Sequence, residues 1–195
     1  VSKELIYKDK HILKVYTEEV RFNRHKLVDG SYMKTAVSFC NLKHNDHACR
    51  AIGYGIAQVA SYAMKHLGNQ IEASLHQIPS DFVNYLEHTT PVIACFSNFT
   101  WNSCLSYDFA TRIKEVHPDS IIVFGGPQYP LEQKEQEAYL RSHPSIDFFI
   151  FREGEQAFVE LFNRLSDYQF SVKNFKSSRI KSPNCHYLFE GDLVM

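Results

Sequence analysis

The stretch that decides the fold is Pro91-Val-Ile-Ala-Cys-Phe-Ser97, an unbroken apolar run that ends in a hydroxyl side chain. A strand in which polar and apolar residues do not alternate is buried on both faces, as in the interior of a parallel sheet. Four further β-prone runs, at 35–42, 71–78, 120–124 and 146–151, alternate with helical patterns. Five strand–helix repeats predict an α/β fold: a doubly wound, flavodoxin-like, five-stranded parallel sheet of order 2-1-3-4-5, with short β-hairpin flanks.

Helices are expected at 48–67, 79–87, 102–116 and 132–142, and from Gly154 onward. Gly68 stands where a C-terminal helix cap belongs, and Asp108 and Arg112 are predicted to form an i,i+4 pair. Three apolar faces are predicted to pack on the sheet: Ile52, Ile56, Val59, Ala63 and Leu67; Leu105, Phe109, Ile113 and Val116; and Phe158, Leu161, Phe162 and Leu165.

The two ends of the chain differ from this repeat. Residues 1–32 predict an N-terminal β-hairpin-like extension, and residues 33–169 the α/β domain. Residues 170–195 predict a C-terminal β-hairpin that turns at Glu190-Gly191-Asp192. Because the sequence stops just after this hairpin, we expect a boundary between two domains there.

Composition excludes several classes of protein. The 195 residues carry a formal net charge of −1, which argues against a surface built to neutralise nucleic-acid phosphates. Apolar runs of a few residues are too short for a membrane span and no secretory leader is visible, so we expect a cytoplasmic protein. The cysteines lack the spacing of a zinc or iron–sulfur site and are expected to be reduced thiols; they are Cys40, Cys49, Cys95, Cys104 and Cys185.

In doubly wound folds a ligand binds beyond the carboxyl ends of the strands, which here selects the loops 41–47, 98–102, 125–129 and 152–155. Gly125-Gly126 follows the fourth strand, where glycine lets the backbone approach a ligand closely. A tight turn into Pro127 would also explain the two glycines. Only the position of the glycine pair at the ligand end of the sheet favours a role in ligand binding. The motifs GxGxxG, GxxxxGK[ST], GxSxG and HExxH are absent from these loops, so dinucleotide, P-loop and hydrolase chemistry lack support.

The loop after the third strand offers a hydroxyl, two amides and a large flat ring, in Ser97, Asn98, Thr100, Trp101 and Asn102. Such a set can hydrogen-bond a neutral ligand rimmed with amides and stack on a planar ring. Helix capping by Asn102 and a core position for Trp101 are the competing interpretation.

Two further loops carry polar candidates. His44 and His47 lie in one loop, and two ligands do not make a metal site, so they are either solvated or offer one imidazole to a metal-containing cofactor. Glu153 lies at the start of the last helix, where an acidic residue is explained by the helix dipole.

These segments resemble the cobalamin-binding domain at the N-terminus of cobalamin-dependent radical S-adenosylmethionine (radical SAM) enzymes. The resemblance runs from about residue 52 to 165. It rests on Ile52-Gly-Tyr-Gly-Ile-Ala-Gln-Val-Ala-Ser-Tyr62, the 91–101 strand and loop, Ile121-Ile-Val-Phe-Gly-Gly-Pro127, Ile146-Asp147 and Arg152-Glu-Gly-Glu-Gln-Ala-Phe158. Each piece alone is weak, whereas Gly-Gly-Pro followed by the Glu-Gly-Glu turn is specific in combination.

The resemblance implies that Ser97 and Gly125-Gly126 line the path of the nucleotide tail, and that the loops after the first and third strands lie under the corrin ring. The candidate cofactor-binding residues are Asn41, Leu42, His44, His47, Ser97, Asn98, Phe99, Thr100, Trp101, Gly125, Gly126, Pro127, Gln128, Glu153 and Gly154. Better-known cobalamin proteins ligate cobalt through Asp-x-His-x-x-Gly, where this chain has Asn45-x-His47-x-x-Arg50. Because the Asp and the Gly are missing, we expect binding without histidine ligation, with His47 as the candidate cobalt ligand otherwise. Gln128 also replaces the family's usual His after Gly-Gly-Pro.

In that family cobalamin carries a methyl group, which a radical SAM domain places on an unactivated carbon. The S-adenosylmethionine and the [4Fe–4S] cluster are expected in a catalytic domain in cis beyond residue 195, because no CxxxCxxC motif occurs here. The chain alone is expected to be inactive, with cobalamin and that catalytic domain as partners and neither nucleic acid nor membrane. Two alternatives stay open: a non-enzymatic α/β interaction module that has lost the cofactor, and a flavin- or nucleotide-binding carrier that uses the same edge.

Overall fold

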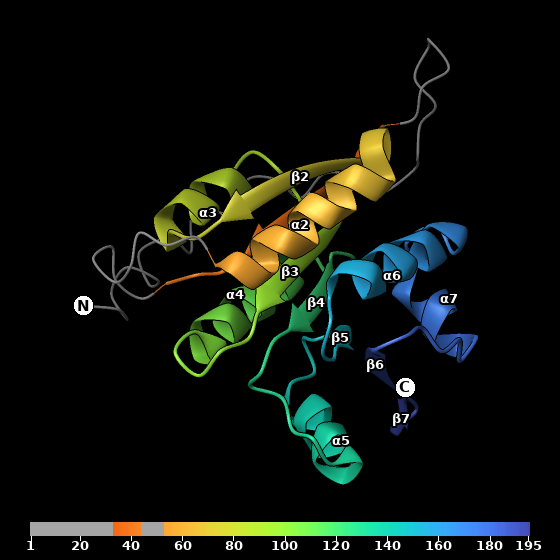
Figure 1. Ribbon diagram of the computed structural model, residues 1–195. Coiled ribbons are helices and arrows are strands. Elements are labelled where there is room, and N and C mark those ends of the chain that lie inside the picture. Colours follow the sequence, from red (N-terminus) through yellow and green to blue (C-terminus); the bar gives the residue numbers. More distant parts are fainter. Residues whose placement is uncertain (1–32, 44–52) are drawn as a thin grey trace.

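One seven-stranded sheet organises residues 33–43 and 53–195, the part of the chain that this computed structural model describes (Figure 1). The strands lie in the order β2-β1-β3-β4-β5-β6-β7. Their bounds are β1 Thr35–Cys40, β2 Ile71–His76, β3 Ile93–Ser97, β4 Ile121–Gly125, β5 Phe148–Ile150, β6 Cys185–Phe189 and β7 Asp192–Val194. Strands β1 to β5 run parallel to one another, β6 pairs antiparallel with β5, and β7 pairs antiparallel with β6.

The predicted α/β class is confirmed, but the predicted five-stranded sheet is too small. The C-terminal hairpin turns at Glu190-Gly191 as expected, yet β6 also pairs with β5 and thereby joins the sheet. Tyr187 of β6 is fully buried and its ring packs edge-on against the ring of Phe148 of β5. Burial of these large rings explains why the hairpin docks on the sheet instead of standing apart from it.

Helices cover both faces of the sheet, as the repeat of strands and helices predicts. On one face lie α2 Tyr54–Leu67, which continues into the short 3-10 helix η2 Gly68–Gln70, with α6 Glu155–Asp167 and α7 Val172–Ser177. On the other lie α3 Pro79–Leu86, α4 Ser103–Val116 and α5 Gln133–Ser142. Figure 1 shows α2 and α6 side by side, where they contact each other. Helix α7 was not expected from the sequence.

The predicted helix faces are confirmed to different degrees. All four predicted residues of α6 are buried. In α4 the buried residues are Ser106, Ala110 and Ile113, while Leu105 and Phe109 are only partly buried at the margin of the core. Small side chains let α4 approach the sheet closely. The helix therefore turns Ser106 and Ala110 toward the sheet and leaves the larger Leu105 and Phe109 at the margin.

Two local predictions concern helix ends and surface pairs. Gly68 caps α2 with φ +52°, as expected. The predicted Asp108–Arg112 pair is wrong, because Arg112 Nη1 instead contacts Glu115 Oε2 at 2.7 Å on the following turn. An i,i+3 spacing brings two side chains together on a helix as readily as i,i+4.

Three sequence predictions lie outside the described residues: the 1–32 extension, the first residues of the 48–67 helix, and the loop that carries His44 and His47. Among the described helices, none combines the length and the apolar character that crossing a membrane requires.

Candidate functional site

The candidate site lies at the carboxyl ends of β1, β3 and β4, which we call the ligand edge. Parallel pairing sets Cys40 opposite Phe96 and Ser97 opposite Gly125. The residues that follow these strands therefore emerge side by side at one edge of the sheet. The ligand edge comprises Asn41, the loop 97–102 and the turn 125–128, which is where the main candidates from the sequence lie.

A buried polar network ties the loops of the ligand edge together. Ser97 Oγ donates to Asn41 Oδ1 at 2.6 Å, and Asn102 Nδ2 donates to Asn41 Oδ1 at 3.2 Å and to Ser97 Oγ at 3.1 Å. Asn102 precedes α4, but its side chain makes no capping bond to the helix; its Oδ1 accepts from the Phe99 amide at 2.8 Å. Asn41, Ser97 and Asn102 thus shape the loops from within.

Gly53 packs against the Asn41 side chain of this network, although no role was predicted for it. A Cβ at Gly53 would lie 2.1 Å from Asn41 Nδ2, so only glycine lets the start of α2 pass over the Asn41 amide. The one signal in the sequence is the Gly-Tyr-Gly that opens the helix of the resemblance.

Asn98 joins the β3–α4 loop to the β4–α5 loop. Its Nδ2 donates to the Gln128 carbonyl oxygen at 2.7 Å and to the Tyr139 hydroxyl oxygen at 3.0 Å. The Gln128 amide in turn donates to the Asn98 carbonyl oxygen at 3.1 Å. Tyr139 lies on α5 in a helical pattern that does not distinguish it, and so it was not identified from the sequence.

Gly126 has a role within the fold that the sequence left open. Its φ is +137°, and a Cβ there would lie 2.6 Å from the Asn98 carbonyl oxygen. Glycine is therefore required for the contact between the turn and the backbone of the neighbouring loop. The tight-turn interpretation accounts for Gly126, and Pro127 and Gln128 beyond it are exposed.

The rings of Phe99 and Trp101 stack on each other, with centroids 4.6 Å apart and planes 9° from parallel. Trp101 is 63% exposed, so it is not a core residue. Beside the pair, Thr100 Oγ1 donates to Gln128 Oε1 at 2.8 Å at the surface. This edge of the sheet therefore presents the indole ring of Trp101 and the polar side chains of Thr100 and Gln128 to solvent.

The remaining predicted residues divide into core, helix-packing and exposed positions. Leu42 is fully buried in the core on the α3–α4–α5 face, so it supports the loop rather than facing a ligand. A Cβ at Gly154 would lie 2.9 Å from Val59 Cγ2, so this glycine lets α6 pack against α2, and Glu153 is exposed. No group of three metal-ligating side chains occurs in the described part of the chain, and His44 and His47 lie outside it.

Electrostatically the ligand edge is close to neutral. Burial raises the pKa of Tyr139, against the lowering effect of the hydrogen bond from Asn98, so the phenol stays protonated near neutral pH. At the end of β2, burial lowers the pKa of His76 below its ordinary value of 6.5, and Asp81 opposes that shift. Neutral amides, hydroxyls and aromatic rings suit a neutral, polar ligand better than a polyanion.

Cys104 is the exposed cysteine of the described residues, in the first turn of α4 next to the ligand edge. Cys40, Cys95 and Cys185 are buried, and burial raises the pKa of each thiol, that of Cys185 to about 12. Burial and the raised pKa both lower the reactivity of these three thiols.

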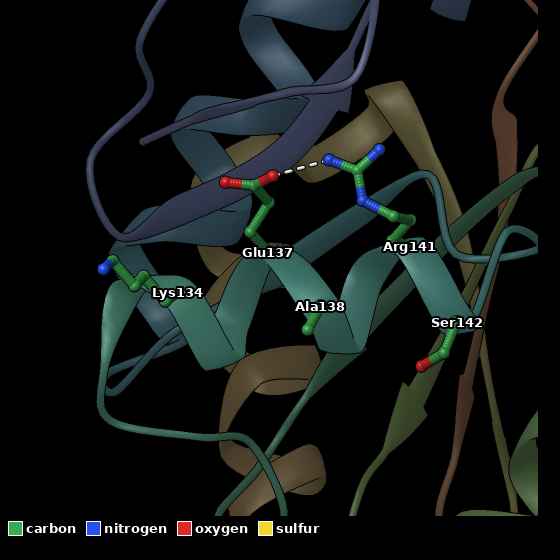
Figure 2. Close-up of a pocket in the computed structure, with 5 residues that line it drawn as sticks. All are labelled: Lys134, Glu137, Ala138, Arg141 and Ser142. Carbon is green, nitrogen blue, oxygen red and sulfur yellow. Dashed lines mark hydrogen bonds and ion pairs between the residues drawn. The ribbon is translucent and has the colours of Figure 1, made fainter.

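A surface hollow of about 420 Å³ lies elsewhere, on α5, where Lys134, Glu137, Ala138, Arg141 and Ser142 line it (Figure 2). Arg141 Nη2 pairs with Glu137 Oε1 at 2.5 Å and donates to the Gly191 carbonyl oxygen at 2.8 Å. Since Arg141 ties α5 to the β6–β7 turn and its charge is paired, this hollow is explained by packing and contains none of the predicted site residues.

The chain is an α/β domain whose candidate site, at the carboxyl ends of its parallel strands, carries neutral polar side chains and an exposed indole ring. No protein-family model matches the chain. A segment of 81 residues, 41% of the chain, is 35% identical to 2-(S-pantetheinyl)-carbapenam-3-carboxylate methyltransferase of Streptantibioticus cattleyicolor. A segment of 79 residues, 40% of the chain, is 34% identical to the cobalamin-dependent radical SAM methyltransferase TokK of Streptomyces tokunonensis. The matches span 12% and 11% of the length of these relatives.

Proposed function

We propose that this chain is a cobalamin-binding domain that holds the corrin at the ligand edge for a radical SAM methyltransferase-type catalytic domain in cis. The observation that carries the proposal is the contact between the β3–α4 loop, which bears the exposed Trp101, and the Gly125-Gly126 turn at the carboxyl ends of the strands. Its partial similarity to two methyltransferases, one of them cobalamin-dependent, supports this ligand over others.

The residues of the ligand edge fit cobalamin in their chemistry. The corrin is a large planar ring with a rim of amides, and the edge offers the exposed indole of Trp101 with the polar side chains of Thr100 and Gln128. Aromatic faces pack against planar rings, and hydroxyl and amide side chains bond ligand amides in either direction. Bound cobalamin would supply a cobalt centre that can carry a methyl group.

The residues of this chain would divide the work between contact and support. Trp101, Thr100 and Gln128 are exposed and would touch the ligand directly. Asn41, Ser97 and Asn102 are buried and bonded to one another, so they would hold the loops in the shape that binding needs. Preorganised loops lose less conformational entropy on binding.

Retention of the cofactor tests the proposal directly. Purified protein is mixed with hydroxocobalamin and desalted, and the corrin absorbance is expected to remain with the protein. Trp101→Ala should reduce retention at least tenfold, whereas Met64→Ala should not change it, because Met64 is also exposed but lies on α2. Loss of all corrin from the wild-type protein would refute the proposal, and retention of a flavin or nucleotide instead would favour the carrier alternative.

The cobalt ligand can be examined in the same protein. We expect His47→Ala to leave the absorbance spectrum of the bound corrin unchanged, because the Asp and Gly that accompany a ligating histidine are absent around it. A shifted spectrum would show that His47 binds cobalt. S-adenosylmethionine and the [4Fe–4S] cluster belong, in this proposal, to the catalytic domain.

A further inference from the structure

The side chain of Asn98 has a fixed orientation. It is fully buried, directly after β3, and one end of its carboxamide faces the carbonyl oxygen of Gln128 at 2.7 Å. A carbonyl oxygen only accepts hydrogen bonds, so the end that faces it must be the NH₂ group. The second hydrogen of that group points to the Tyr139 hydroxyl oxygen at 3.0 Å.

This orientation leaves the other end of the carboxamide unsatisfied. Asn98 Oδ1 is buried and accepts no hydrogen bond from any residue that the structure describes. Buried polar atoms in folded proteins nearly always have a partner, because an unpaired one has lost its bonds to water without replacement. The Asn98 oxygen is held in a fixed position without a hydrogen-bond donor, which indicates that a bound partner supplies the donor.

The position of Asn98 makes a bound ligand that partner. Asn98 lies between Ser97 and the stacked rings of the partly buried Phe99 and the exposed Trp101, within the ligand edge. The β3–α4 and β4–α5 loops, which Asn98 joins, are also bonded to each other at the surface by Thr100 and Gln128, where water competes for the bond. Because the Asn98 oxygen is buried, binding of a ligand to it would require a local opening at these two loops.

We propose that Asn98 Oδ1 accepts a hydrogen bond from a primary amide of the bound ligand and so selects an amide over a carboxylate at that position. The inference rests on the proposed cobalamin function and adds the chemical group that the edge recognises. Asn98 Oδ1 has no hydrogen to give, so a carboxylate or phosphate oxygen placed against it would meet two facing acceptors. Sites that satisfy a buried polar group with a ligand hydrogen reject analogues that lack it.

Cobalamin monocarboxylic acids, in each of which one side-chain amide is a carboxylate, provide the test. Dissociation constants are measured at pH 7 by absorbance titration for hydroxocobalamin and each monoacid, with the wild-type protein, Asn98→Leu and Tyr139→Phe. Wild type should bind one monoacid at least tenfold more weakly than hydroxocobalamin. In Asn98→Leu that ratio should fall to within threefold of one, and in Tyr139→Phe, which keeps the Asn98 oxygen, it should persist.

The outcomes separate the two proposals. A wild-type protein that binds no corrinoid refutes cobalamin binding and this inference with it. A wild-type protein that binds hydroxocobalamin and every monoacid equally, or an Asn98→Leu variant that still discriminates, overturns only the role of Asn98. If Asn98→Leu does not fold, the comparison of hydroxocobalamin with the monoacids in the wild-type protein still tests whether the site distinguishes an amide from a carboxylate.

Discussion

At the scale of single residues, Gly126 combines a positive φ with close contact to the backbone of a neighbouring loop. Its φ of +137° and the 2.6 Å that would separate an added Cβ from the Asn98 carbonyl oxygen both exclude alanine. Gly126→Ala should therefore lower the free energy of unfolding by at least about 2 kcal/mol in urea titrations. Gly55→Ala is the control, because nothing lies within 4 Å there and helical alanine is favoured by up to about 1 kcal/mol. Equal effects of the two changes would contradict the role given to Gly126 in the turn.

His76 should make stability depend on pH. Burial lowers its pKa in the folded protein below 6.5, so the unfolded chain binds the proton more readily. Its contribution is complete above pH 6.5 and is lost as the pH falls from there to the folded-state value. Burial likewise lowers the pKa of His117 and His186, which add to the slope.

The His76 contribution can be separated by substitution. His76→Gln cannot titrate but can still bond Ser74 Oγ, which lies 2.9 Å from His76 Nε2. The decline in unfolding free energy between pH 7 and pH 5 should be shallower in this variant than in the wild-type protein. An unchanged slope in His76→Gln would assign the pH dependence to other groups.

At the scale of elements, the ends of β1, β3 and α4 are joined by the Asn41–Ser97–Asn102 network. Ser97→Ala removes the 2.6 Å bond to Asn41 Oδ1 and leaves buried amide groups short of a partner, which costs about 1–3 kcal/mol of unfolding free energy. Thr100→Ala removes a surface bond of similar length, and its cost should stay below about 0.5 kcal/mol. Urea titration of both variants measures the two losses of unfolding free energy. Similar losses would mean that burial does not strengthen the Asn41–Ser97–Asn102 hydrogen bonds.

The elements were predicted well from the sequence where periodicity and turn residues agreed. Each of the five parallel strands begins and ends near the ends of its apolar run. The polar and turn residues on either side of the run limit where a buried strand can form. The inward face of α4 was predicted less well because close approach to the sheet favours Ser106 and Ala110 over the larger Phe109. Docking of β6 on β5 escaped prediction because a hairpin pattern does not encode which strand it will meet.

At the scale of the whole molecule, the C-terminal segment belongs to the same hydrophobic core as the parallel strands. The ring of Tyr187 contacts the rings of Phe148 and Phe175, and its hydroxyl donates to the Ile180 carbonyl oxygen at 2.9 Å. Tyr187→Ala should cost about 3–5 kcal/mol of unfolding free energy by opening a cavity. Tyr187→Phe, which loses only the hydroxyl bond, should cost about 1 kcal/mol. A Tyr187→Ala protein as stable as Tyr187→Phe would show that the hairpin is not part of the folding unit.

The location of the candidate site could be predicted from the sequence, but not the role of each residue in it. Parallel strands place their following loops at one edge, so Asn41, Ser97 and Gly126 were found together. Whether each of these residues is buried and supports a loop, or is exposed and can contact a ligand, depends on side-chain packing between loops. Such packing produces no local pattern in the sequence. Tyr139 acts on the site from α5, where no local pattern marks it, and Gly53 acts from the start of α2, where the Gly-Tyr-Gly motif does not indicate its contact with Asn41.

The distribution of thiols provides a spectroscopic handle on the ligand edge. Cys104 is exposed two residues after Asn102, while Cys40, Cys95 and Cys185 are buried with raised pKa values. In a Cys49→Ser background, an environment-sensitive maleimide dye should attach to Cys104 in the folded protein. A change in the fluorescence of this dye would then report the binding of a molecule near the Phe99–Trp101 pair, in real time and without a coloured cofactor.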